Sequence, residues 1–278
     1  MHQLRAVISL SQVGANLGFF TLLAARRGYD VIAVEPAPES VQRLLHSIHR
    51  NGFATSSSPE DVRASSRRLL EDVERERAAV SSSSSSLRLG SVAREEQEWG
   101  TPSQRLGAEE RMATVSVFHN GGDDEYGRLM LAFDAGNPGA TSLRQPFDED
   151  KQVVGARGEH PNVVDVVPLD DLRQFGVNPR HLAAVKINAE GMDARVLHGM
   201  RGLLAEGRPP FVMMVLNDAH VQQRGCRPRE LILNLIRWGW RLWDYGVYRT
   251  TETEVSRFLS DHHGQSLEVL FVEQSVDF

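Results

Sequence analysis

The sequence predicts an α/β fold built on a mostly parallel sheet, and two observations support this class. In the first 53 residues, apolar β-prone runs alternate with segments whose apolar residues recur at helical spacing, and short links join them. Residues 31–34, Val-Ile-Ala-Val, are apolar at every position, as expected of a strand buried on both faces of a parallel sheet. The order strand, helix, strand then predicts a right-handed crossover.

The elements before residue 54 follow from this alternation and from its turn signals. Gly14 follows the first apolar run, Gly28 ends the first helical segment, and Glu35-Pro36 ends the second run. We therefore expect a strand at 6–10, a helix at 18–27, a strand at 31–34 and a helix at 40–51.

Residues 54–110 interrupt the pattern. They contain three serines at 56–58, six serines at 81–86 and a highly charged stretch at 71–77. Such a composition buries little apolar surface per residue. We expect a low-complexity, disordered insertion within a single domain that spans 1–278.

The alternation returns after the insertion. β-Branched and apolar runs predict further strands, and helical spacing separates most of them. The expected elements are strands at 113–118, 129–133 and 163–167, a helix start at 168–172, strand 183–187, helix 192–205, strand 211–216, helix 227–238, strand 240–245, helix 252–259 and strand 267–272. The number of expected core strands suits a seven-stranded open sheet.

The amino-acid composition of the chain argues against several classes of function and site. A formal net charge of -6 and a pI near 5.9 do not provide the broad basic surface that nucleic-acid phosphates require. The single cysteine, Cys226, excludes an intramolecular disulfide and a Cys-rich metal site. The histidines lack the H-x-x-x-H spacing of zinc sites with an adjacent acid, so we expect no metal.

The chain also lacks a sequence signal for membrane insertion. No run reaches the roughly 18 apolar residues of a membrane span, and residues 1–10 do not have the pattern of a signal peptide. We therefore expect no membrane span, and the compartment stays open. Because Met1 lies only a few residues before the first expected strand, one hypothesis is that an upstream leader or helix has been lost.

Three residues at the ends of the first two strands predict a ligand site. In an open parallel sheet, ligands bind beyond the carboxyl ends of the strands. Gly14 and Gly18 follow the first strand and permit a close approach of ligand to backbone, and Glu35 follows the second strand, where a carboxylate can bind a ribose diol. A purely structural turn is the alternative. A nicotinamide-binding site would need a tighter G-x-G-x-x-G turn.

Four blocks of sequence resemble the FkbM-type family of S-adenosylmethionine-dependent methyltransferases. The first two are Val-Gly-Ala-Asn-Leu-Gly-Phe-Phe-Thr-Leu at 13–22 and Val-Ile-Ala-Val-Glu-Pro-Ala-Pro at 31–38. The others are Val-Pro-Leu-Asp-Asp-Leu at 167–172 and Val-Lys-Ile-Asn-Ala-Glu-Gly-Met-Asp-Ala-Arg-Val-Leu-His-Gly-Met at 185–200, which is similar to the family's K-I-D-V-E-G-A-E-x-x-V-L-x-G-A block. The blocks arrive in family order.

The resemblance implies a Rossmann-like class I methyltransferase fold. Its seven-stranded sheet has the order 3-2-1-4-5-7-6, with the seventh strand antiparallel. S-adenosylmethionine is the implied cofactor, and a hydroxyl of a small molecule or glycan is the implied methyl acceptor. By position, Gly14, Asn16 and Gly18 would approach the methionine part of the cofactor, Glu35 the ribose, and Asn120 the adenine.

The chain departs from the family pattern at three acidic positions. Gln12 and Asn188 stand where the family has aspartate, and Asn217 stands where it commonly has glutamate. All three positions are expected at carboxyl ends of central strands, where the cofactor amine and the substrate hydroxyl would meet. An amide accepts a hydrogen bond but cannot take a proton.

These changes leave two functional hypotheses. Glu190 survives near Asn188 and is the candidate catalytic base, although a structural carboxylate at a helix N-terminus is an equal alternative. We interpret the neighbouring Asp193 as a solvated helix residue. The first hypothesis is an active methyltransferase, and the second is a catalytically impaired relative that binds cofactor or a partner without turnover.

Overall fold

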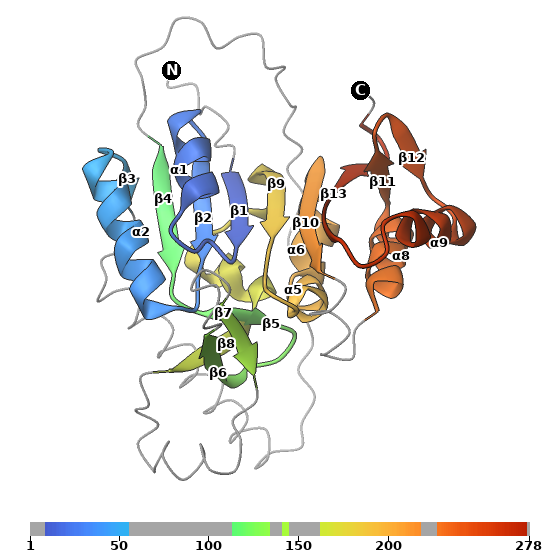
Figure 1. Cartoon of the computed structure of the whole chain (residues 1–278). Helices are drawn as coiled ribbons and strands as arrows, with labels where there is room; N and C mark the ends of the chain where they lie inside the picture. The colour runs from blue at the N-terminus through green and yellow to red at the C-terminus, as the bar shows by residue number, and fades with distance from the viewer. Residues whose placement is uncertain (1–8, 56–112, 134–140, 145–161, 218–226, 277–278) are drawn as a thin grey trace, which may run out of the picture.

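The computed structural model describes residues 9–55, 113–133, 141–144, 162–217 and 227–276 (Figure 1). The expected insertion at 54–110 lies outside the described residues except for its first two, which form the short strand β3, Ala54–Thr55. The described residues form two sheets with helices on both faces of the larger one.

The larger sheet contains nine strands in the order β12-β11-β13-β10-β9-β1-β2-β4-β3. The central strands pair in parallel, whereas β13 runs antiparallel to both β10 and β11. The strands other than β3 are β1, Ser9–Val13; β2, Asp30–Val34; β4, Thr114–Phe118; β9, Leu182–Ile187; β10, Phe211–Asn217; β11, Trp240–Asp244; β12, Val247–Arg249; and β13, Ser266–Glu273. The expected seven strands are thus extended by β3 and β12 at the edges.

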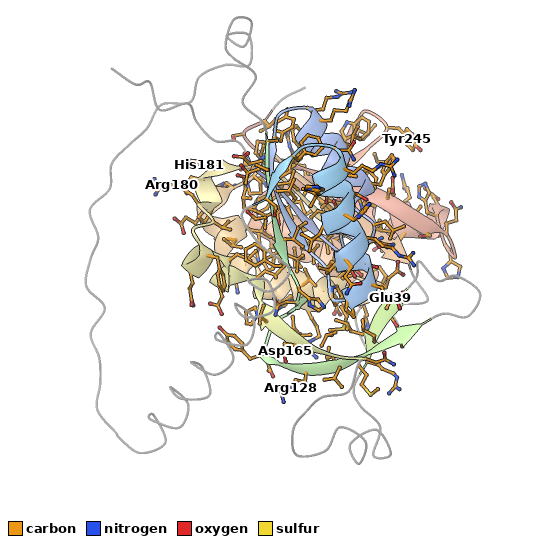
Figure 2. The ribbon with its side chains drawn as sticks, turned by 90° about the vertical axis from the view of Figure 1, so that its left-hand side faces the viewer. Glu39, Arg128, Asp165, Arg180, His181 and Tyr245 are labelled. Atoms are coloured by element: carbon orange, nitrogen blue, oxygen red, sulfur yellow. The ribbon has the colours of Figure 1, made fainter. Side chains whose placement is uncertain are left out.

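A second sheet lies beyond the carboxyl ends of the parallel strands (Figure 1). Its order is β5-β8-β6-β7, built from β5, Gly121–Asp123; β6, Gly127–Phe133; β7, Thr141–Arg144; and β8, Val163–Pro168. The runs predicted at 129–133 and 163–167 therefore pair with each other. On the outer side of this sheet, Arg128 and Asp165 form an ion pair of 3.1 Å between neighbouring strands (Figure 2).

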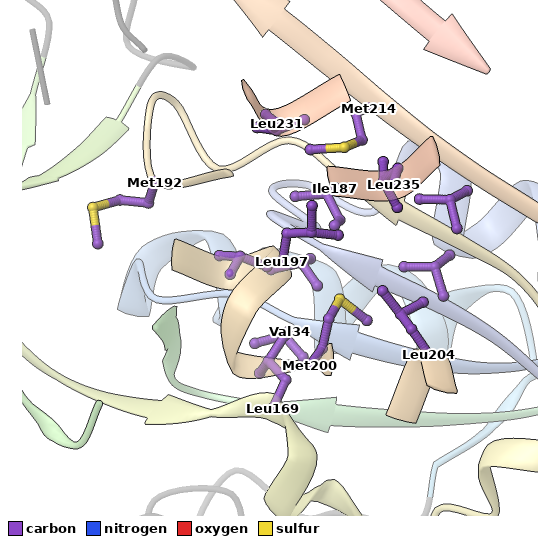
Figure 3. Packing of buried hydrophobic residues seen from close by; sticks show 14 of the residues in the cluster. Val34, Leu169, Ile187, Met192, Leu197, Met200, Leu204, Met214, Leu231 and Leu235 are labelled. Carbon is purple, nitrogen blue, oxygen red and sulfur yellow. The ribbon is translucent and has the colours of Figure 1, made fainter. Parts of the chain in front are cut away.

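Each face of the larger sheet has its own apolar core because side chains alternate along buried strands. In β2, Val31 and Ala33 belong to one core, with helices α1, Phe19–Arg26, and α2, Pro38–Arg50. Ile32 and Val34 belong to the other core, with α5, Asp193–Gly199; α6, Arg201–Gly207; and α8, Pro228–Trp238. Figure 3 shows Ile187 and Met214 of the sheet among Leu197, Leu204 and Leu235 of these helices.

The described residues also form one α-helix near the C-terminus and two 3₁₀ helices after β8. Helix α9, Glu252–Asp261, begins at a capping box between Thr251 and Glu254. The helix start predicted at 168–172 is a 3₁₀ helix, η2, Leu169–Phe175, and a second short one is η3, Pro179–His181.

Two sequence predictions differ from the structure near the site. The first strand does not end at Leu10 but continues to Val13, because its polar residues Ser11 and Gln12 pair with strands on both sides. The helix predicted at 192–205 is divided at Met200 into α5 and α6. There Gly199 packs so closely on β5 that a Cβ atom would lie 1.7 Å from the Asp123 carbonyl oxygen.

Candidate active site

A shallow cleft, open to solvent, lies where the carboxyl ends of β1, β2, β4 and β9 meet the second sheet. From the larger sheet and its loops it is lined by six of the predicted site residues, Gly14, Asn16, Glu35, Asn120, Asn188 and Glu190. The two other predicted site residues, Gln12 and Gly18, do not line it. Most residues of the predicted site, which come from separate segments of the sequence, therefore line a single cleft.

Gly14 directly follows β1 and lies between the ends of β2 and β9. Its N–H donates to the Val34 carbonyl at 2.9 Å, and its φ is +75°, in the region that favours glycine. A Cβ atom at this position would lie 1.9 Å from the carbonyl oxygen of Asn188, whose own N–H donates to Val13 at 3.0 Å. Only glycine therefore fits between the two strand ends.

Asn16 and Gly18 shape the rest of this turn in different ways. Asn16 has a φ of +50° and borders the cleft, and its backbone N–H donates to the Glu35 carboxylate at 2.7 Å. Gly18 precedes α1 with a φ of +89°, and a Cβ atom there would lie 2.2 Å from Leu44 Cδ1. Gly18 thus permits the close packing of α1 against α2.

Glu35 is held rigidly at the end of β2. Its side chain is buried; Oε2 accepts the Asn16 bond, and Oε1 accepts from Ala37 N–H at 2.8 Å. Burial raises the pKa of Glu35, and these two backbone bonds oppose the rise. Each carboxylate oxygen can accept more than one hydrogen bond, so Glu35 retains acceptor capacity for a ligand hydroxyl in the cleft.

Gln12 lies beneath α1 rather than at the cleft. It is buried within β1, and its Oε1 accepts a hydrogen bond of 2.7 Å from the hydroxyl of Thr21 in α1. The expectation that Gln12 shares a pocket with Asn188 is therefore not met. Asn217 is the last residue of β10, and its side chain lies outside the described part of the chain.

The loop between β9 and α5 forms one wall of the cleft. Asn188, Ala189, Glu190 and Met192 line it, and Glu190 has a φ of +47°. Asp193, predicted as a solvated residue, is in fact 1% exposed and accepts backbone bonds from this loop. That prediction is wrong because the carboxylate at the start of α5 points back into the loop, not outward.

The second sheet supplies cleft residues that the sequence did not reveal. They are Gly121, Gly122, Thr141 and Leu143, which lie on the same side of the cleft as the predicted Asn120, a buried residue in the link from β4 to β5. A Cβ atom on Gly121 would meet Leu143 at 2.6 Å, so the glycine allows β7 to pack closely. The Gly-Gly pair after a strand was the available signal, but it indicated only a loop.

The described residues contain no group of three or more His, Cys, Asp or Glu side chains placed to hold a metal ion. Within the same part of the chain, each helix is too short or too polar to cross a bilayer.

The FkbM methyltransferase domain family matches residues 12–242. The chain belongs to this family. The matched range begins within β1 and ends within β11, so it includes every residue that lines the cleft. The curated proteins include none that matches the chain.

Two solved structures are similar to the chain over almost its whole length. One is the methyltransferase FkbM from Methylobacillus flagellatus KT, with 12% identity and a TM-score of 0.41; the alignment covers 98% of this chain and 45% of that protein. The other is Sp1610 from Streptococcus pneumoniae, a candidate tRNA (m1A22) methyltransferase, with 10% identity and a TM-score of 0.39; the alignment covers 99% of this chain and 67% of that protein.

FkbM methyltransferases use S-adenosylmethionine, and the residues of the cleft fit this molecule. Glu35 provides a fixed acceptor for ribose hydroxyls, and the carboxylates of Glu35 and Glu190 give the cleft negative charge that suits a cationic sulfonium.

Proposed function

We propose that this domain is an S-adenosylmethionine-dependent methyltransferase that methylates a hydroxyl oxygen of a small molecule or glycan. Family membership supports the reaction class, and the fixed Glu35 carboxylate at the cleft is the observation on which the cofactor assignment depends. The run β4-β2-β1-β9-β10-β13-β11 supports the class I methyltransferase fold, because it corresponds to the order 3-2-1-4-5-7-6 with an antiparallel seventh strand.

The cleft residues divide into a cofactor side and an acceptor side. Glu35 would bind the ribose hydroxyls, and Asn120 would lie near the adenine. Gly14 and Asn16 would lie near the methionine part, and Asn188 would lie where this part meets the methyl acceptor. When bound, S-adenosylmethionine supplies an electrophilic methyl group.

Glu190 is the proposed base on the acceptor side. It borders the cleft next to Asn188, and a carboxylate can take the proton that an acceptor hydroxyl loses. Asn188 can orient that hydroxyl by accepting its hydrogen bond, but it cannot take the proton. This division of roles needs only one acid in the β9–α5 loop.

A second candidate function is binding of the cofactor or a partner without turnover. Asn188 favours it, because this residue lines the cleft with an amide where the family has an acid. General-base catalysis typically contributes about 100-fold or more, so loss of a required base would leave binding but very slow transfer.

Calorimetric titration with S-adenosylmethionine, followed by transfer assays on a panel of hydroxylated acceptors, tests both candidates. Binding with transfer that is abolished in Glu190→Gln supports the methyltransferase. Binding without transfer to any acceptor supports the second candidate. No binding at millimolar concentration rules out both cofactor-dependent functions.

A further inference from the structure

Asp193 lies directly behind the loop that carries Asn188 and Glu190. Its side chain is 1% exposed and does not line the cleft. Oδ1 accepts a hydrogen bond from Ala189 N–H at 3.0 Å, and Oδ2 accepts one from Gly191 N–H at 3.1 Å. The carboxylate therefore binds the peptide groups on both sides of Glu190.

The loop conformation requires such an anchor. Glu190 and Gly191 have consecutive positive φ values of +47° and +96°, a conformation that is unfavourable for a residue with a Cβ atom. Glu190 can hold it only where the surroundings fix the backbone. Two further backbone bonds hold the ends of the loop, from Asn188 N–H to Val13 and from Met192 N–H to Ala189.

The charge of the surroundings is consistent with an ionised anchor. Burial raises the pKa of Asp193, whereas the backbone bonds from Ala189 and Gly191 and the positive charge of Lys186 oppose the rise. Lys186 lies on β9, just before the loop, and its own pKa is lowered by burial. The backbone hydrogen bonds and the partly buried Lys186 ammonium thus both favour the charged form of the Asp193 carboxyl.

From this geometry we infer that Asp193 is a positioning residue, which holds the backbone of Glu190 and Asn188 so that their side chains face the cleft. This inference rests on the proposed function for the roles of those two residues. It does not make Asp193 a catalytic residue, because its carboxylate is separated from the cleft by the loop itself.

The test compares Asp193→Asn with a matched control, Asp170→Asn. The Asp170 carboxylate also accepts two backbone bonds, from Gly202 at 2.9 Å and Leu203 at 2.6 Å, but it does not line or support the cleft. Both variants lose one carboxylate acceptor, so both should unfold at lower denaturant concentration than the parent. Only Asp193→Asn should weaken binding of S-adenosylmethionine, by about tenfold, and accelerate hydrogen exchange at the amides of Ala189 and Gly191 by a similar factor.

Equal loss of affinity in both variants, or unchanged affinity in Asp193→Asn, would overturn the inference. If Asp193→Asn does not fold, hydrogen exchange in the parent protein decides: the amides of Ala189 and Gly191 must exchange slowly, and fast exchange at either refutes the anchor. If the parent does not bind S-adenosylmethionine, the proposed function fails. The exchange measurements still report whether Asp193 orders the loop, so the two failures are distinguishable.

Discussion

Gly14 occupies a position that a residue with a Cβ atom cannot take without moving a strand end. Gly28 has a similar φ, +82° against +75°, but a Cβ atom there would meet nothing within 4 Å. Gly28→Ala should therefore cost only the left-handed backbone strain, about 1 kcal/mol. Gly14→Ala adds a contact of 1.9 Å with the Asn188 carbonyl oxygen and should cost at least about 2 kcal/mol more.

Urea denaturation of the two alanine variants measures this difference, and calorimetry shows its effect on the cleft. We expect Gly28→Ala to bind S-adenosylmethionine as the parent does and Gly14→Ala to bind it more weakly. Equal destabilisation of the two variants would mean that the ends of β1 and β9 move apart easily, contrary to the packing described above.

Asn188 and Gln12 are two of the amides at acidic family positions, but the structure separates their effects. Asn188→Asp adds a negative charge to the cleft and should improve binding of the cationic cofactor by on the order of 1 kcal/mol, or about fivefold. Gln12→Asp adds a charge beneath α1, removes the longer side chain that Thr21 contacts, and should lower stability without improving affinity. Calorimetry and urea denaturation of both variants check this; improved binding by Gln12→Asp alone would contradict it.

At the scale of elements, sequence patterns identified most strands and helices but missed the features that depend on distant partners. The buried run of β2 and the amphipathic pattern of α2 are local signals, and both elements formed near the expected bounds. The continuation of β1 through Ser11 and Gln12 depends on pairing with β2 and β9, which polar side chains do not indicate. Asp193 was misread for a related reason: a carboxylate at a helix start usually faces solvent, and only the fold of the loop buries it.

The contact between β5 and α5 is an element-scale feature with a predicted pH dependence. Arg195 of α5 lies 2.5 Å from Asp123 and 2.8 Å from Asp124. Burial raises the pKa of Asp123 from its ordinary 3.8 to about 6, and Asp124 adds to the rise. Between these values the folded state binds more protons than the unfolded state, so the contribution of Asp123 to stability falls as pH rises through this window.

Asp123→Asn should remove that contribution. The free energy of unfolding of the parent minus that of Asp123→Asn should therefore decrease from about pH 4 to about pH 6 and then level off. Urea denaturation across this range measures the difference, with Asp165→Asn on the outer side of the second sheet as the control. A difference that rises with pH would show that Arg195 outweighs burial and that the sign is reversed.

At the scale of the whole molecule, the cleft depends on the meeting of two sheets, and only one of them was predictable. The larger sheet follows from the strand–helix alternation. The second sheet pairs β5 with β8, which lie 40 or more positions apart in the sequence, and local periodicity does not indicate such a pairing. Six predicted residues reached the cleft because they follow parallel strands that end at one edge. The residues from β5 and β7 could not be predicted, because their place depends on that long-range pairing.

A ligand that binds in this cleft contacts both sheets and should stabilise the folded chain as a whole. By mass action, S-adenosylmethionine at 100 times its Kd should add about 2.7 kcal/mol, or roughly 5–10 °C in Tm. NAD should give no shift, because the turn after β1 lacks the tighter glycine pattern of dinucleotide sites.

Glu35→Gln should reduce the Tm shift caused by S-adenosylmethionine, since an amide replaces one acceptor oxygen with a donor. Glu39→Gln, on the exposed side of α2, should leave that shift unchanged. Thermal denaturation of the three proteins with each ligand measures these shifts; an equal S-adenosylmethionine shift in the parent and in Glu35→Gln would mean that Glu35 organises the turn around Asn16 and Ala37 but does not bind the ribose.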